Sequence, residues 1–195
     1  MAVNFNISSF KEAIGAGSRP NLFRIVVTPP SGYVLPNFTF LCRSASLPAD
    51  SMGLIEVPMN AGRRLKIAGD RTFPDFTTTV LNDEGFIIRS NVEKWQNDIV
   101  KTNFNLTKIG RRSVATTSDT NTTALTTGSM EVYQLDGTGA DVNKGKVKLF
   151  NCWPSDISAI DLSYDTTDSI EEFTITWTYD YHVHSFESES ESEET

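Results

Sequence analysis

The stretch Ala68-Gly-Asp-Arg-Thr-Phe-Pro-Asp-Phe-Thr-Thr-Thr-Val-Leu-Asn-Asp-Glu84 decides how this chain folds. Its Gly69-Asp70 pair is predicted to make a turn. The β-branched and aromatic residues that follow suit the half-buried, pleated surface of a strand. One face of that strand would carry Phe76, Thr78 and Val80. Asn82-Asp83-Glu84 is typical of a helix N-cap with an acidic first turn. The stretch therefore joins a strand to a helix.

The helix predicted after this stretch is the chain's only substantial one. Its apolar stripe, spaced by four, three and four residues, consists of Ile88, Val92, Trp95 and Ile99. Strand-like alternation marks residues 22–28, 37–43, 63–68, 130–135, 146–153 and 170–184. The fold class is therefore mainly β, with an antiparallel sheet that is wet on one side. The expected core contains Phe38, Phe40, Phe76, Trp95, Trp153, Phe173, Ile175 and Trp177.

Several details of this assignment can be tested directly. Residues 37–43 are expected to form a hairpin with 22–28, with Phe38, Phe40 and Cys42 on one face. Trp153-Pro154 is expected to end its strand, Ile157, Ile160 and Leu162 to begin another element, and 170–184 to be one unbroken strand. A capping box from Ser9 to Glu12 predicts a short helix that Gly15 and Gly17 close.

The chain of 195 residues is long enough for one well-buried domain. We expect that domain to span 1–186, with an N-terminal arm or short helix at 1–18, an extended arm at 44–60 and a flexible loop at 101–128. The acidic segment 187–195 cannot bury apolar surface and is expected to be disordered. The arm at 44–60 either covers its own subunit or reaches a neighbour.

The net charge of −8 argues against a general binder of nucleic acid or membrane surfaces, since both require a basic face. The charge is also uneven. Residues 1–128 carry 14 Lys and Arg against 10 Asp and Glu, whereas residues 129–195 carry 3 against 15. This asymmetry suits head-to-tail self-association, although the acidic tail alone explains much of it.

Enzymatic chemistry is not indicated. The sequence contains no nucleophile elbow, phosphate loop, His-Glu-x-x-His or Cys-x-x-Cys motif. Cys42 is interpreted as a small buried hydrophobe, and His182 and His184 as too few ligands for a strong metal site even beside Glu187. We expect no enzyme activity, cofactor, metal or membrane anchor.

The ordered set of motifs resembles the tail tube proteins of contractile-tailed, T-even-like bacteriophages. The match runs from about residue 9 to residue 183, and its most specific piece is Ala68-Gly-Asp-Arg-Thr-Phe73 followed by Asn82-Asp-Glu84. The other matching segments are Arg19-Pro-Asn-Leu-Phe23, Asn37-Phe-Thr-Phe40, Leu47-Pro-Ala49, Val80-Leu81, Trp95-Gln96, Trp153-Pro154 and 170–181. Residues 113–128 and the acidic tail depart from the family pattern.

The resemblance implies two packed antiparallel sheets, sandwich-like or barrel-like, with one flanking helix, as in the tube protein of type VI secretion. It implies stacked hexameric rings that form the inner tail tube of a virion, assembled in the bacterial cytoplasm, through which DNA passes without specific binding. The implied partners are other copies of the chain, the tail sheath protein, the baseplate, the tape-measure protein and the tail terminator.

Residues for subunit contacts are expected on the arm and near the central stretch. The apolar anchors for ring-to-ring contact are Leu54, Ile55, Val57 and Met59, and the charges that contact neighbouring subunits are Arg63, Arg64, Asp70, Arg71, Asp83 and Glu84. We also expect a polar, acidic lumen, with the threonine-rich faces of 74–81 and 172–182 as candidate linings. The alternatives are an effector-carrying tube of a phage-like or type VI-like particle, a monomeric β-sandwich binding module that uses the 101–128 loop, and a hydrolase with an unrecognised site.

Overall fold

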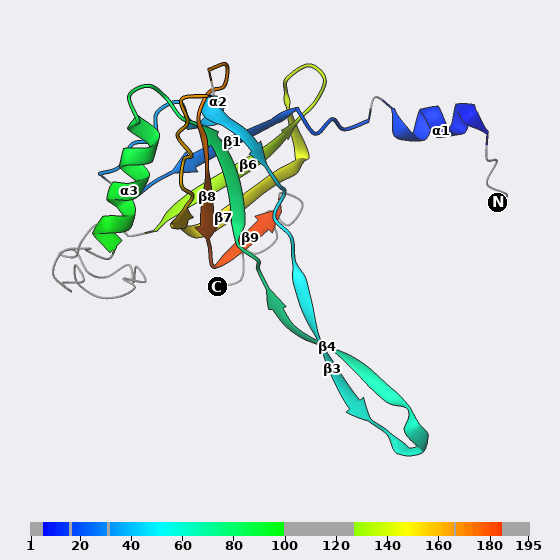
Figure 1. The fold of residues 1–195 in the computed structure, drawn as a ribbon. Helices are drawn as coiled ribbons and strands as arrows, with labels where there is room; N and C mark the ends of the chain where they lie inside the picture. The colour runs from blue at the N-terminus through cyan, green and yellow to red at the C-terminus, as the bar shows by residue number, and fades with distance from the viewer. Residues whose placement is uncertain (1–5, 16, 31, 100–126, 166, 185–195) are drawn as a thin grey trace, which may run out of the picture.

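A computed structural model describes residues 6–15, 17–30, 32–99, 127–165 and 167–184 of the chain. Strands dominate the described elements, which confirms the mainly β class (Figure 1). The elements are, in chain order, α1 (Ile7–Ile14), β1 (Phe23–Thr28), α2 (Phe38–Leu41), β2 (Cys42–Ala45), β3 (Ser51–Pro58), η1 (Asn60–Gly62), β4 (Arg64–Thr72), β5 (Phe76–Leu81), α3 (Ile87–Ile99), β6 (Gly128–Leu135), β7 (Asp141–Ile157), β8 (Glu172–Thr178) and β9 (Tyr181–His184).

One antiparallel sheet contains all of the described strands except β3 and β4. Its order is β1-β6-β7-β8-β5-β2, and β9 also pairs with β7. The expected two packed sheets are therefore two halves of one sheet that share β7. The first part of β7 pairs with β6 and β9, and the last part of β7, from Trp153, pairs with β8. Asn151 lies between the two parts with a left-handed φ of 55°.

The central stretch forms the strand and helix that the sequence predicts. In β5, Phe76, Thr78 and Val80 are buried on one face. The Asp83 carboxylate accepts a hydrogen bond of 3.1 Å from the Ile87 backbone N–H, as a capping side chain does at the start of a helix. The first three members of the predicted stripe of α3 are buried, namely Ile88, Val92 and Trp95.

Aromatic rings join α3 to the sheet. The Trp95 ring lies 5.9 Å from the rings of both Tyr33 and Trp177, and the Phe38 ring meets Trp177 edge-on at 6.2 Å. Both halves of the sheet contribute to the single hydrophobic cluster around these rings. The expected core residues in it are Phe38, Phe76, Trp95, Phe173, Ile175 and Trp177, with Trp153 partly buried against them.

Phe40 was wrongly assigned to the core, because residues 37–43 do not form a strand paired with β1. Asn37 adopts a left-handed φ of 58°, and the chain then makes the single helical turn α2. Residues two apart point in different directions on a helix, so Phe38 is buried while Phe40 is 84% exposed. The Thr39 hydroxyl donates to the Ile25 carbonyl at 2.7 Å and holds α2 against β1. The strand that follows, β2, pairs with β5 instead.

The C-terminal strand and β7 also differ from the sequence prediction. Residues 179 and 180 separate β8 from β9, and this break reverses the alternation, so Tyr181 is exposed and His182 is buried. Trp153-Pro154 does not end β7, which continues to Ile157. Residues 158–165 and 167–171 then belong to no helix or strand, contrary to the element expected there.

Parts of the predicted organisation lie outside the described residues. They are residues 1–5, 101–126 of the predicted loop, and the acidic tail 187–195. In the part of the chain that the structure describes, no helix has both the length and the apolar character needed to cross a membrane.

Candidate assembly surfaces

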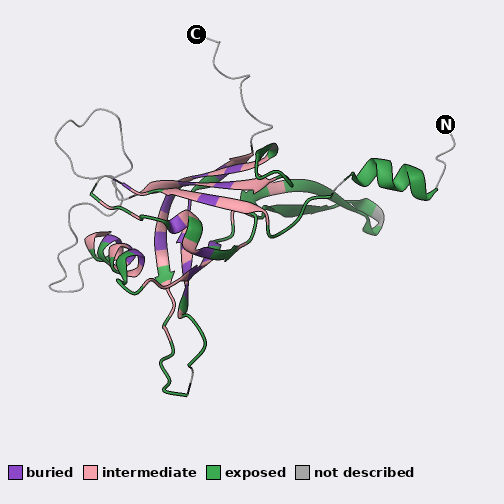
Figure 2. Cartoon of the chain, turned by 90° about the horizontal axis from the view of Figure 1, so that it is seen from above, coloured by how far each residue is buried: buried purple, intermediate pink, exposed green. Residues whose placement is uncertain are grey.

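The β3–β4 hairpin projects away from the sheet and is the most prominent exposed surface of the described chain. Its strands pair only with each other, and Figures 1 and 2 show it as a long, exposed arm. The predicted arm at 44–60 therefore contains β3 and is completed by β4. Its exposed apolar side chains are Met52, Leu54, Ile55, Val57, Met59, Leu65 and Ile67.

These side chains line both faces of the hairpin. Ile55 pairs with Ile67 across the strands, and Val57 pairs with Leu65. Each of the four is at least 40% exposed, since no other described element covers the hairpin. A two-stranded hairpin without a covered face is marginally stable in water. An arm with two uncovered apolar faces is suited to packing against another protein surface.

Two glycines let the strands of the arm approach closely near its base. Gly53 and Gly69 face each other where the register shifts, and a Cβ added to Gly69 would lie 2.9 Å from the Gly53 carbonyl carbon. The predicted turn at Gly69-Asp70 was wrong, because both residues lie inside β4. The glycine is needed for close backbone approach rather than for a reversal of the chain.

A charged cluster holds the base of the arm to the sheet. The Asp50 carboxylate, just before β3, lies 2.9 Å from the His182 imidazole of β9 and also accepts a hydrogen bond from Arg71 of β4. The Arg71 bond is the main reason that the pKa of Asp50 is lowered, with His182 and His184 adding to it. The Phe73 ring meets the His182 ring edge-on at 5.1 Å. Sequence reasoning missed this cluster, because His182 and Asp50 are far apart in the chain.

The charges expected to contact other subunits have different positions. Arg64 pairs with Glu56 at 2.6 Å within the arm, Arg71 belongs to the cluster at its base, and Asp83 caps α3. Arg63, Asp70 and Glu84 are exposed, and none of them makes an ion pair with another described residue. Arg63 and Arg64 thus lie near the tip of the arm and Asp70 and Arg71 near its base, whereas Asp83 and Glu84 lie just before α3.

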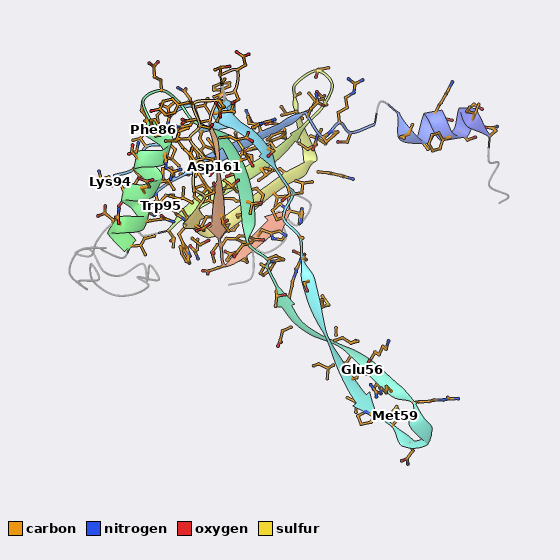
Figure 3. All side chains as sticks on the ribbon, viewed as in Figure 1. Glu56, Met59, Phe86, Lys94, Trp95 and Asp161 are labelled. Carbon is orange, nitrogen blue, oxygen red and sulfur yellow. The ribbon has the colours of Figure 1, made fainter. Side chains whose placement is uncertain are left out.

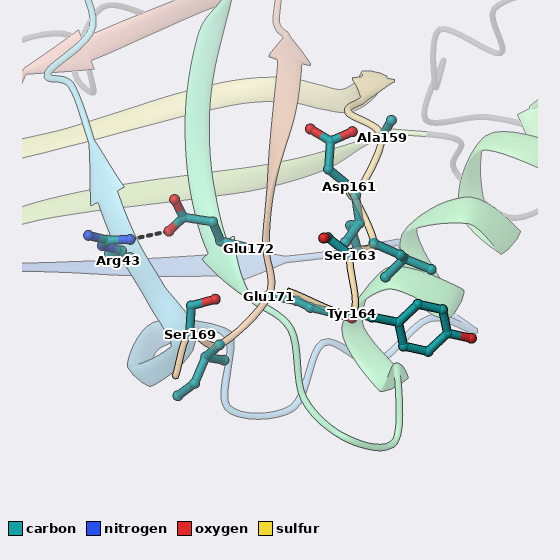
Figure 4. A pocket seen from close by; sticks show the side chains of 11 residues that line it. Arg43, Ala159, Asp161, Ser163, Tyr164, Ser169, Glu171 and Glu172 are labelled. Carbon is teal, nitrogen blue, oxygen red and sulfur yellow. Dashed lines mark hydrogen bonds and ion pairs between the residues drawn. The ribbon is translucent and has the colours of Figure 1, made fainter. Parts of the chain in front are cut away.

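A second exposed surface lies at the end of the sheet beside α2. It carries Phe40, Leu162, Tyr164 and Ile170, each at least 69% exposed. The segment after β7 and Arg43 line an open cavity of about 700 Å³ there. Figure 4 shows this cavity, with Arg43 bonded to Glu172 across it. Sequence reasoning missed this surface, although apolar residues in a segment rich in Ser, Thr and Asp were its signal.

The N-terminal helix α1 also exposes an apolar stripe. Ile7, Phe10 and Ile14 are each more than half exposed, and Figure 1 shows α1 standing away from the sheet. Its N-cap is Asn6, whose side chain accepts from the Ser9 N–H, so the helix begins earlier than the predicted capping box. Gly15 ends it, as predicted.

The solvent side of β5 and β8 is a surface of hydroxyl groups. Thr77 pairs with Thr176 and Thr79 pairs with Thr174 across the two strands. All of these side chains alternate with buried neighbours, so they share the face away from the core. The threonine side chains are polar and uncharged, and Glu172 on the same face of β8 is paired with Arg43 of β2.

A family model described as "Phage tail tube protein" matches residues 5–185. The chain belongs to the phage tail tube protein family. It is 30% identical to "Tail tube protein gp19" of Enterobacteria phage T4 over 164 residues, which are 83% of this chain and 88% of that protein. The corresponding protein of Enterobacteria phage T6 is 31% identical over 164 residues, again 83% of this chain and 88% of that protein.

The same fold occurs in solved contractile injection systems. A chain in the PVC sheath–tube complex in its extended state aligns with 93% of this chain and 98% of its own length, with a TM-score of 0.59 and 14% identity. A chain in the anti-feeding prophage cap aligns with 94% of this chain and 93% of its own length, with a TM-score of 0.57 and 15% identity. At such low sequence identities, these two similarities show only that the fold is shared.

As a phage tail tube protein, the chain is a structural component of a contractile tail and not an enzyme. Its two cysteines agree with that role. Burial raises the pKa of Cys42 to about 11 and that of Cys152 to about 12, so neither thiol is a ready nucleophile. No group of three potential metal ligands occurs among the residues that the structure describes.

Proposed function

We propose that six copies of this chain form a ring and that rings stack into the inner tube of a contractile phage tail. The observation that carries this proposal is the β3–β4 hairpin, whose apolar side chains have no cover in the described chain. Contacts between rings would bury Leu54, Ile55, Val57 and Met59. Family membership supports the tube, because the T4 and T6 relatives are tail tube proteins.

Edges of the sheet support the closing of each ring. The described sheet ends at β1 on one side and at β2 on the other, and β9 pairs with only part of β7. Exposed strand edges present unpaired N–H and C=O groups that invite pairing with another chain. Joining the sheets of neighbouring subunits into one inner barrel removes those edges, and a heterologous contact of this kind closes into a ring.

The tube acts as a conduit for DNA that does not bind it specifically. The hydroxyl face of β5 and β8 is a candidate lining, because its threonine side chains offer neither cations to hold phosphates nor large apolar groups to hold bases. The T4 relative is a phage protein, which favours DNA over an effector protein as the cargo.

The partners we propose are the tail sheath protein, the baseplate, the tape-measure protein and the tail terminator. Chains with the same fold occur in a sheath–tube complex, in a tube-terminating cap and in a baseplate. We further propose that subunits assemble in the bacterial cytoplasm and remain in the tail of the virion.

Negative-stain electron microscopy of the purified protein, at low and high concentration, tests the proposal. Hollow tubes or six-fold rings are the expected result. Monomers that persist at high concentration, even after tail components are added, would contradict it and favour a monomeric binding module.

A further inference from the structure

We propose that the cavity beside α2 receives the tip of the β3–β4 hairpin from a second copy of this chain. The inference rests on the proposed function, because it names the surface that receives the arm when rings stack. The recipient surface is here called the acceptor cavity and consists of Arg43 with residues 159–164 and 169–172.

The acceptor cavity has the size and exposed apolar surface of a binding site. Its volume of about 700 Å³ lies in the range of about 300–1,000 Å³ that is usual for ligand pockets. Leu162 and Ile170 line it and are 80% and 69% exposed, although side chains of this kind are normally covered. Tyr164 at its rim is fully exposed, and Figure 4 shows its ring directed away from the sheet.

The acceptor cavity and the segment that forms it are negatively charged, since Asp161, Glu171 and Glu172 line the cavity with Arg43, and Asp165 and Asp168 lie beside it in the chain. Residues 158–172 contain five acidic residues and no Lys or Arg. Glu172 is neutralised by Arg43, and Glu171 accepts a hydrogen bond from Asn82. The remaining carboxylates, Asp161, Asp165 and Asp168, are exposed and make no ion pair with another described residue. The surface therefore suits a partner that is both apolar and cationic.

The tip of the arm has that chemistry. Met59 is 55% exposed there, and its backbone N–H donates to the Arg63 carbonyl at 2.8 Å, which closes the turn and places Arg63 beside it. Arg64 is paired with Glu56. Arg63 and Lys66 are exposed and form no ion pair with any described residue. The tip thus offers a flexible apolar side chain and two free cations (Figure 3 labels Met59 and Glu56).

The positions of the two surfaces favour contact between copies. Figure 1 shows the tip of the arm at one end of the molecule, whereas α2 and the segment after β7 lie at the other end. The eight residues of β3 extend for roughly 26 Å at about 3.3 Å per residue, long enough to reach beyond the subunit's own sheet. Two different patches at opposite ends make a heterologous contact, which repeats without closing and so builds a filament.

Cross-linking between two variants, each with one added surface cysteine, tests the position of the contact. Met59→Cys protein is mixed with Tyr164→Cys protein, assembled into tubes and treated with a short bismaleimide. A covalent dimer is expected from this mixture. The matched control pairs Met59→Cys with Val34→Cys, because Val34 is also exposed but lies outside the acceptor cavity. The native Cys42 and Cys152 are buried.

The outcomes separate the two proposals. Tubes in which Met59→Cys links to Val34→Cys and not to Tyr164→Cys would overturn the acceptor cavity and leave the tube itself standing. Unmodified protein that forms neither rings nor tubes would overturn the proposed function, and the docking would fall with it.

Charge exchange provides an independent test. Reversing Asp161, Asp165 and Asp168 to Lys should abolish tubes, as should Arg63→Glu with Lys66→Glu. Both sets combined in one chain should restore tubes, because the complementary charges are exchanged. Lys144→Glu, an exposed change of the same sign as the arm variant, serves as the control and should still assemble. Tubes that tolerate either reversal, or that the combination fails to restore, would contradict the proposed pairing.

Discussion

At the scale of single residues, one buried hydrogen bond joins two strands of the core. The Trp177 indole N–H of β8 donates to the Thr78 hydroxyl of β5 at 2.9 Å, and both residues are almost completely buried. A buried donor without an acceptor costs more than the bond itself contributes. Thr78 is thus an acceptor rather than only a small residue on the apolar face of β5.

Replacing Thr78→Val removes this acceptor while keeping the shape of the side chain. We expect the free energy of unfolding to fall by about 1–3 kcal/mol, because the Trp177 N–H stays buried without a partner. Urea unfolding followed by fluorescence measures the change. Thr79→Val, on the opposite face of the same strand, is the control and should change stability by about 0.5 kcal/mol or less. Equal stability of the two variants would show that the bond contributes little.

Asp50 predicts a pH dependence for the arm. Its pKa is lowered in the folded protein, chiefly by Arg71. The ionised carboxylate therefore stabilises the folded state fully above the ordinary carboxyl pKa of about 4. This stabilisation is lost as the pH falls through the lowered pKa of Asp50. The ionisable groups that act on it are Arg71, His182 and His184. We expect the orientation of the arm relative to the sheet to be fixed at neutral pH and to become variable only at acidic pH.

Spin labels at Met59→Cys and Val34→Cys measure this change as a distance distribution between the arm and the sheet. The distribution should be narrow at pH 7 and broaden at low pH, with near-ultraviolet circular dichroism confirming that the core remains folded. Asp50→Asn should already be broad at pH 7, because the neutral amide binds Arg71 less strongly. A narrow distribution in Asp50→Asn at pH 7 would show that the cluster does not fix the arm.

At the scale of elements, the arm depends on the close approach of its two glycines. A Cβ on Gly69 would contact the Gly53 backbone at 2.9 Å, and backbone atoms cannot move aside as a flexible side chain does. Gly69→Ala should therefore loosen the pairing of β3 with β4 and leave the sheet intact.

Amide hydrogen exchange tests the glycine pair. In Gly69→Ala, exchange should become faster in β3 and β4 and remain unchanged in β5 to β8. Gly137→Ala is the control, because an added Cβ there meets nothing within 4 Å. Uniform acceleration in all strands would indicate global destabilisation instead of a local change in the arm.

The elements that sequence predicts well are those determined by nearby residues. β5 and α3 follow from alternation, from a spacing of three and four, and from a cap within five residues. α2 was missed because its turn depends on a bond from Thr39 to a carbonyl of β1. The break between β8 and β9 was missed because the Asp180 N–H donates to Phe150 on another strand. The cluster at Asp50 likewise required a partner 132 positions away in the chain, at His182.

At the scale of the whole molecule, the apolar arm is the surface through which we propose that subunits assemble. Ile55→Ser with Val57→Ser should leave the monomer folded, because neither side chain contributes to the core in the described chain. Burying a large aliphatic side chain contributes about 1.5–3 kcal/mol. Loss of two such contacts therefore predicts a critical concentration for assembly at least about 100-fold higher, at 1.4 kcal/mol for each factor of ten.

Sedimentation measures the critical concentration, and circular dichroism checks that the monomer is folded. The matched control is Val34→Ser with Val142→Ser, two exposed valines outside the arm. The control should assemble like the unmodified protein. If the arm variant also assembles normally, its apolar side chains are not assembly contacts.

The strand β7 has a consequence for the quality of the finished tube. Because one strand runs through both halves of the sheet and both halves contribute to one hydrophobic cluster, detaching either half would expose core residues of the other. Unfolding of either half should therefore destabilise the other, which favours cooperative, two-state unfolding of the subunit. Partly folded subunits would then be rare during assembly, and few would be incorporated into a tube that they could later weaken. The shared strand would thus favour incorporation of completely folded subunits without the help of another protein.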